Sequence, residues 1–102
     1  MFYIHGTKST TMFIEIQEIA KEHIPSCTFY KRSEINQEPG INKKLHDAMV
    51  LGNTAKGKVE IIFCDDEGLK KVHTTIWAKG EKFITLKGGV WIPISKIVDI
   101  IF

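Results

Sequence analysis

Residues 58–102 alternate between short runs rich in Val, Ile, Thr, Phe and Trp and turns that contain glycine or acidic residues. Turn signals fall at 65–68, 79–81 and 88–89. Runs of this length, cut by turns at this spacing, are typical of a small antiparallel β-meander. The pattern predicts strands at 58–64, 69–78, 82–87 and 90–92, a tight type I′ turn at Gly88-Gly89, one helical turn at 93–96 and a closing strand at 97–102.

The N-terminal half has a helical pattern instead. From Thr11 to His23, apolar residues recur every three or four positions, and Pro25 follows, which predicts an amphipathic helix at 11–23. A second, shorter helix is predicted at 43–51, capped by Asn42 and stopped by Gly52-Asn53. Residues 1–11 are expected to be an extension in which FYIH can pair as a short strand.

A chain of 102 residues fits one domain, with an extension at 1–11, a helical region at 11–53 and a small β-barrel at 58–102. No apolar run is long enough for a membrane helix, and the N-terminus lacks the pattern of a secretory signal. We therefore expect a cytoplasmic protein with no membrane partner. The predicted core is Phe13, Ile16, Ile19, Leu45, Met49, Val59, Ile61, Phe63, Val72, Ile76, Ile84, Leu86, Ile92, Ile94 and Ile97.

The order of these elements resembles that of an SH3-like small β-barrel. The segment VEIIFCDDEGLKKVHTTIWAKGEKFITLKGGVWIPISKIVDI carries the resemblance, and it is most similar to bacterial Rho-binding antiterminator-type and Sm-like domains. GGVWIPISKI has no Arg-Gly pair of the Sm kind, so no site residue is transferred. The resemblance implies an α+β fold in which the N-terminal helices pack on a five-stranded antiparallel SH3-like barrel or strongly bent meander. It implies binding more often than catalysis.

The net charge of +2 is unevenly distributed. Between Leu69 and Lys96 there are six lysines and one acid, Glu81. Such an excess can serve a polyanion, but lysines also protect exposed strand edges against aggregation. The second interpretation is favoured on charge alone, because the stretch has no arginine.

No residue pattern indicates catalysis, a metal or a cofactor. The four histidines are scattered, and Pro25 separates His23 from Cys27. Cys27 and Cys64 are expected to be small buried hydrophobic residues, with a disulfide or a reactive thiol as the less favoured alternative. The Asp65-Asp66-Glu67 group lacks the spacing of a calcium loop. No nucleophile elbow or phosphate loop occurs, so we expect a protein that is not an enzyme.

Aromatic residues and lysines alternate on the predicted strands in a way that suggests a binding surface. If Val72 and Ile76 face the core, their neighbours face outward, and small barrels hold single-stranded nucleic acid with aromatic rings in a basic groove. The candidate site residues for RNA or single-stranded DNA are Lys71, Trp77, Phe83, Lys87 and Trp91. The alternative is that a helix covers this face and the rings belong to the core.

A second hypothesis is a protein-interaction or regulatory module. The same aromatic face could bind a protein partner, or the apolar strand Ile97–Phe102 could pair with a partner chain or form a homodimer. Exposed tryptophans with clustered positive charge would favour nucleic acid, whereas a flat apolar edge at 100–102 would favour a protein partner.

Overall fold

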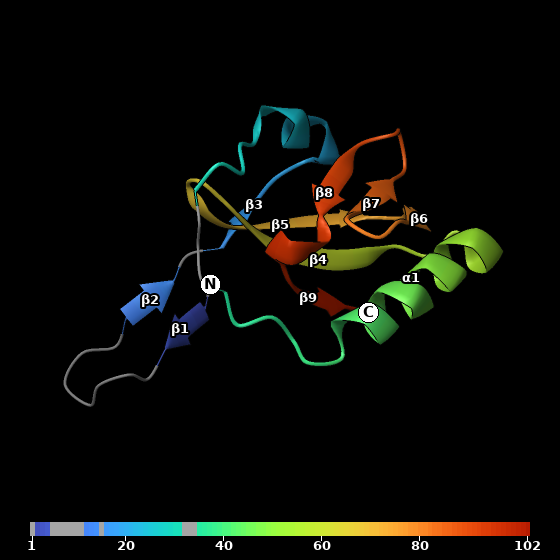
Figure 1. Cartoon of the computed structure of the whole chain (residues 1–102), viewed down its shortest axis with the longest axis horizontal. Coiled ribbons are helices and arrows are strands. Elements are labelled where there is room, and N and C mark those ends of the chain that lie inside the picture. Colours follow the sequence, from blue (N-terminus) through green and yellow to red (C-terminus); the bar gives the residue numbers. More distant parts are fainter. Residues whose placement is uncertain (1, 5–11, 15, 32–34) are drawn as a thin grey trace.

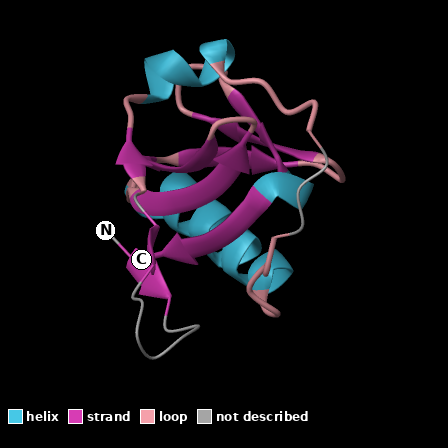
Figure 2. Cartoon of the chain, turned by 90° about the vertical axis from the view of Figure 1, so that its left-hand side faces the viewer, coloured by secondary structure: helices cyan, strands magenta, loops and turns pink. Residues whose placement is uncertain are grey.

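The structure is a computed structural model, and it describes residues 2–4, 12–14, 16–31 and 35–102. The fold is α+β, as predicted, with one main helix and two larger sheets (Figure 1). The helix α1 lies on one side of the strands and the short 3-10 helix η1 on the other (Figure 2). The elements are β1 (Phe2–Ile4), β2 (Met12–Ile14), β3 (Gln17–Glu18), η1 (Lys21–Ser26), α1 (Ile41–Ala55), β4 (Val59–Asp65), β5 (Gly68–Thr74), β6 (Ile76–Lys79), β7 (Phe83–Leu86), β8 (Trp91–Pro93), η2 (Ile94–Lys96) and β9 (Ile97–Ile101).

The strands form a four-stranded sheet of order β3-β5-β4-β9, a three-stranded sheet of order β6-β7-β8, and the separate pair β1-β2. β3 runs parallel to β5, and the other paired strands are antiparallel. The two larger sheets do not join into a closed barrel, and the predicted five-stranded antiparallel arrangement, as a barrel or as a strongly bent meander, is not confirmed. The predicted strand order from 58 to 102 is otherwise present.

The predicted strand at 69–78 is two strands in two sheets, β5 and β6. Thr74, Thr75 and Ile76 are buried in succession, which breaks the two-residue alternation of a continuous strand. The chain passes from one sheet to the other at Thr75, whose carbonyl accepts a hydrogen bond from the Lys87 N–H at 2.9 Å. The pairing of β5 with β4 ends at Thr74, and the pairing of β6 with β7 begins at Ile76, so the sheets separate at Thr75.

The predicted helix at 11–23 is wrong. Its described residues form β2, β3 and the start of η1. β2 pairs with β1, β3 pairs with β5, and the Ile19 N–H donates to the Lys71 carbonyl at 2.9 Å. The apolar spacing fits a helix, but the stretch also contains three isoleucines and one phenylalanine, residue types that favour strands. Pairing with neighbouring strands satisfies the backbone groups that a helix would have satisfied internally.

Helix α1 is longer than predicted at both ends, and Gly52-Asn53 does not stop it. Gly52 is buried where the helix approaches β6, and a Cβ at this position would lie 2.4 Å from the Ile76 carbonyl oxygen. The helix ends instead at Lys56, which adopts the left-handed conformation (φ 52°, ψ 34°) and donates its N–H to the Gly52 carbonyl. The glycine permits close packing of α1 on β6 rather than ending the helix.

The turn between β7 and β8 also differs from its prediction. The Gly89 N–H donates to the Leu86 carbonyl at 2.9 Å, so Lys87 and Gly88 are the two central residues. Gly88 has a φ of 93°, whereas Lys87 does not have a positive φ. A type I′ turn needs positive φ at both central residues, and positive φ at the second alone is a feature of type II.

The predicted core is largely confirmed. The confirmed core residues are Leu45, Val59, Ile61, Phe63, Val72, Ile76, Ile84, Leu86, Ile92 and Ile97. Ile19, Met49 and Ile94 are partly buried against this core, Ile16 is half-buried outside it, and Phe13 lies outside the residues whose side chains are described. The core also includes Ile24, Ile41, Ala48 and Ile100, which are not among the predicted core residues.

The C-terminal strand β9 is an edge strand that pairs with β4. Part of its outer edge is occupied from within the chain. The Glu38 N–H donates to the Val98 carbonyl at 2.9 Å, and the Asp99 carboxylate accepts the Ile100 N–H at 2.7 Å. These contacts reduce the edge that is open to a pairing strand, although the Phe102 side chain remains 61% exposed.

Candidate functional site

The sheet β6-β7-β8 exposes two large aromatic side chains on its outer face. Along β7, Ile84 is fully buried while Phe83 is 42% exposed. On β8, Ile92 is buried while Trp91 is 61% exposed. This is the strand alternation that the sequence predicts for these residues. Their exposure does not fit the alternative in which both rings are buried under a helix.

Phe83 and Trp91 form an aromatic pair. Their ring centroids are 5.5 Å apart, and the rings meet edge to face at 68°. Register explains the contact, because Phe83 pairs with Pro93 and Thr85 pairs with Trp91, which places the two rings on one face of neighbouring strands. We call these two residues the Phe83–Trp91 face. An edge-to-face pair fixes both rings while leaving ring surface open to solvent.

A hollow of about 410 Å³ lies beside this face. Besides Phe83 and Trp91, it is lined by Ala78, Lys79, Gly80, Glu81, Lys82 and Thr85. Within the described part of the chain, neither Lys79 nor Lys82 forms an ion pair. Two unpaired lysines against the single Glu81 give the hollow a net positive charge beside exposed rings.

Three further lysines of the 69–96 excess are engaged within the protein. Lys70 is buried and pairs with Asp65 at 2.7 Å and with Glu67. The side chain of Lys96 donates to the Lys31 carbonyl at 2.8 Å. Lys71, a predicted site residue, lies on β5 in the other sheet and pairs with Glu60 at 3.4 Å. Because of these contacts, fewer lysines are available to bind a polyanion than the count from the sequence suggests.

Trp77 and Lys87 do not join the Phe83–Trp91 face. Trp77 lies at an irregularity in the β6–β7 pairing, between Ile76 and Ala78, and is 48% exposed. Together with Lys87 it lines a different cavity, at the end of α1. The five predicted residues are therefore distributed over three places: the Phe83–Trp91 face, the Trp77 cavity and β5.

Sequence reasoning missed the lysines that accompany Trp77. Lys56 and Lys58 line the same cavity, although they precede Trp77 by about twenty residues. The packing of α1 on β6 brings them there. The Lys-Gly-Lys run at 56–58 was a visible signal, but only the tertiary contact assigns it to Trp77.

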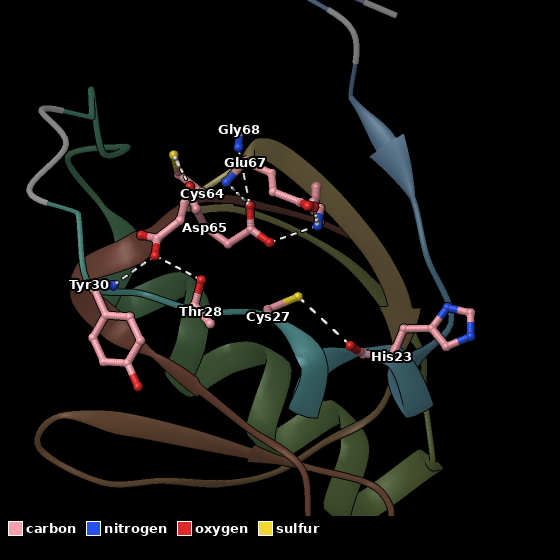
Figure 3. Close-up of polar contacts among 10 residues, drawn as sticks. His23, Cys27, Thr28, Tyr30, Cys64, Asp65, Glu67 and Gly68 are labelled. Carbon is pink, nitrogen blue, oxygen red and sulfur yellow. Dashed lines mark hydrogen bonds and ion pairs between the residues drawn. The ribbon is translucent and has the colours of Figure 1, made fainter.

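A cluster of polar contacts lies at the β4–β5 hairpin (Figure 3). The Asp66 carboxylate accepts hydrogen bonds from the Thr28 hydroxyl at 2.7 Å and from the N–H groups of Tyr30 and Lys31 at 3.2 and 2.7 Å. The Asp66 N–H donates in turn to the Thr28 carbonyl at 2.9 Å. The cluster fastens the segment 28–31 to the hairpin, which is a structural role.

Cys27 belongs to this region but is not arranged as a nucleophile. Its thiol lies 3.8 Å from the His23 carbonyl oxygen, while the His23 imidazole points away from it (Figure 3). Burial raises the pKa of the Cys27 thiol to about 11, with the Asp65 carboxylate adding to the effect. The thiol is therefore protonated at neutral pH. Cys27 and Cys64 do not form a disulfide with each other, and both are half-buried rather than buried as predicted.

The Asp66 contacts predict an acid-sensitive hairpin. The Lys31 N–H, with the Thr28 hydroxyl and the Tyr30 N–H, holds the pKa of Asp66 below its ordinary value. A carboxyl group whose pKa is lower in the folded state stabilises the fold above its unfolded pKa, and this contribution is lost as pH falls through the folded pKa. We expect Asp66→Ala to destabilise the protein at pH 7 and to lose less stability than the wild type on acidification from about pH 5 downward.

Urea unfolding at a series of pH values measures this effect. Asp47→Ala is the matched control, because Asp47 makes only an exposed pair with Lys43 on α1, a kind of contact worth about 0.3–0.5 kcal/mol. Parallel pH profiles for the wild type and Asp66→Ala would contradict the role assigned to the Asp66 carboxylate.

Among the described residues, no three His, Cys, Asp or Glu side chains are grouped so that they could hold a metal ion. No helix in the described ranges has both the length and the apolar character to cross a membrane. Comparison with known protein families, curated proteins and solved structures finds no match for this chain.

Proposed function

We propose that this chain is a non-enzymatic module that binds RNA or single-stranded DNA on the Phe83–Trp91 face. The supporting observation is the exposed edge-to-face pair of Phe83 and Trp91 beside Lys79 and Lys82, which have no ion pair in the described part of the chain. Exposed rings stack on bases of any sequence, and lysines beside them neutralise the phosphates.

The strand connectivity supports a relation to SH3-like small barrels. The long second strand is bent into β5 and β6, η2 precedes the last strand, and that last strand pairs with β4, the first of the series. This is the order on which the sequence resemblance rests. In such domains an exposed strand face commonly serves for binding, and this general tendency is consistent with the proposed role of β6-β7-β8.

Anisotropy of a labelled single-stranded RNA, titrated with the protein at several salt concentrations, tests the proposal. If Lys79 and Lys82 each neutralise one phosphate, log K should fall with log salt at a slope of about −1.4. We expect Trp91→Ala to weaken binding about 5- to 150-fold, because stacking contributes about 1–3 kcal/mol per base.

Tyr30→Ala is the matched control, since Tyr30 is 90% exposed but lies outside this face. Equal affinity of Trp91→Ala and the wild type would refute the proposal. So would an affinity that does not change with salt. Failure of RNA and DNA to bind, together with stable self-association through β9, would assign the chain to the protein-interaction class instead.

A further inference from the structure

The cavity beside Trp77 is a separate basic site. It has a volume of about 310 Å³, near the lower limit for small-molecule sites in proteins. Gly52, which packs closely against Ile76 of β6, is one of its lining residues. The remaining lining residues come from the end of α1, the link to β4, the start of β6 and the β7–β8 turn: Asn53, Lys56, Lys58, Thr75, Trp77 and Lys87.

All the charged side chains that line this cavity are positive. Three lysines line it and no carboxylate does. Within the described residues, Lys56, Lys58 and Lys87 form no ion pair. The end of α1 contributes a partial negative charge of roughly half a unit, but the backbone N–H groups at 56 and 57 already satisfy two of its carbonyls. The partial negative charge of the helix end is therefore too small to neutralise three ammonium groups. A bound anion would neutralise them.

Trp77 gives the cavity a flat apolar side. Its side chain is 48% exposed, although the adjacent Ile76 and Thr75 are buried. A half-exposed indole beside ammonium groups suits a planar ring that carries a phosphate, because the ring can stack while the phosphate meets the lysines. Asn53 adds an amide that can both donate and accept hydrogen bonds.

The backbone conformation of Lys56 is a second observation in favour of a positively charged site at this cavity. This residue occupies the left-handed position at the end of α1, where glycine is the usual and least strained choice. The helix end does not require a lysine at this position. Lys56 is also one of the residues that line the cavity, so its positive charge lies at the cavity's edge.

We propose that this cavity binds a nucleoside phosphate, with the base against Trp77 and the phosphate among Lys56, Lys58 and Lys87. The ligand is either a free nucleotide or the phosphorylated end of a strand, since both present the same chemistry. The site is distinct from the Phe83–Trp91 face and does not depend on nucleic-acid binding there.

The test uses the full chain carrying Trp91→Phe, in which Trp77 is the only tryptophan. Its fluorescence is titrated with adenosine and uridine monophosphates, with the two unphosphorylated nucleosides and with inorganic phosphate. We expect saturable quenching by the monophosphates and at least about tenfold weaker binding of nucleosides and of phosphate, because each lacks one of the two interactions. Absence of saturable quenching by the monophosphates would overturn the proposal.

Lysine variants in the same background separate this site from general attraction of anions. Lys58→Gln and Lys87→Gln should each weaken nucleotide binding several-fold, whereas Lys79→Gln, in the other hollow, should not. Lys56→Gly is the sharpest variant, because glycine relieves the left-handed conformation while removing the charge. It should weaken binding with an unchanged or higher midpoint of thermal unfolding. Equal effects of Lys58→Gln and Lys79→Gln would contradict a defined site.

Competition with oligonucleotides identifies the source of the ligand. If an oligonucleotide with a 5′ phosphate competes and its unphosphorylated form does not, the site takes strand ends. If neither competes, it takes free nucleotides. Both results support the cavity as the site. Because the fluorescence in this background comes from Trp77 alone, nucleotide binding at the cavity stands or falls separately from the proposed nucleic-acid function.

Discussion

Replacing Phe63 with alanine is expected to destabilise the protein by about 3–5 kcal/mol, the largest effect of any single substitution considered for this fold. Phe63 is fully buried on β4, the strand that pairs with both β5 and β9. The centroid of its ring lies 6.1 Å from that of the Phe29 ring, and this ring pair links the segment after η1 to the sheet. Truncation removes apolar burial and leaves a cavity in a place where paired strands on both sides restrict collapse.

Denaturant unfolding measures this loss. Phe83→Ala is the matched control, because it removes the same atoms from a side chain that is 42% exposed, and it should cost about 1 kcal/mol or less. A domain of this size has a stability of about 5–15 kcal/mol, so the Phe63→Ala protein can lie close to its unfolding threshold. Phe63→Leu, expected to cost about 1.5 kcal/mol, then provides the measurement. Equal losses at 63 and 83 would contradict the assigned core.

The second large effect is expected at Gly52. Alanine is the better helix former by about 1 kcal/mol, so helix propensity alone predicts stabilisation. In the fold, however, the added Cβ would lie 2.4 Å from the Ile76 carbonyl oxygen and 2.8 Å from the Thr75 methyl carbon. Backbone of β6 cannot yield as a flexible side chain can, and α1 must move away from the sheet. We expect a net destabilisation of about 2 kcal/mol.

Asn53→Ala is the control for Gly52→Ala. It changes the neighbouring helical residue, which is exposed, and should be neutral or slightly stabilising because alanine favours the helix. The midpoint of thermal unfolding compares the two variants. A higher midpoint for Gly52→Ala than for the wild type would show that α1 does not approach β6 as closely as described.

The strands from 59 to 101 could be predicted because local signals agree there. β4 and β7 are rich in the β-branched and aromatic residues that favour strands, and a glycine with positive φ occurs at 68 and at 88, where turns require it. The N-terminal helix could not be excluded in the same way. Its apolar spacing satisfies a helix, and one of the competing strands, β3, depends on pairing with β5, about fifty residues away in the chain. A pairing partner at that separation leaves no local signal.

The candidate site was predictable to a similar degree. Strand alternation was sufficient to place Phe83 and Trp91 on an exposed face. It could not show that Lys71 pairs with Glu60, because the register of β4 against β5 decides that contact. Nor could it bring Lys56 and Lys58 to Trp77, since this depends on how closely α1 packs on β6. The sequence thus predicts which side chains of one strand share a face. It does not predict which side chains of different elements meet, because strand register and helix packing decide that.

The most direct test of the proposed function is to follow backbone and indole N–H signals of isotope-labelled protein by NMR during titration with a short single-stranded RNA. The Phe83–Trp91 face predicts that the largest shifts occur at the Trp91 indole and at the amides of residues 79–85 and 91, and that added salt reverses them. Tyr30 and the exposed residues of α1 should stay unchanged. Shifts that are absent, or that concentrate on β9 and residues 100–102, would contradict the account.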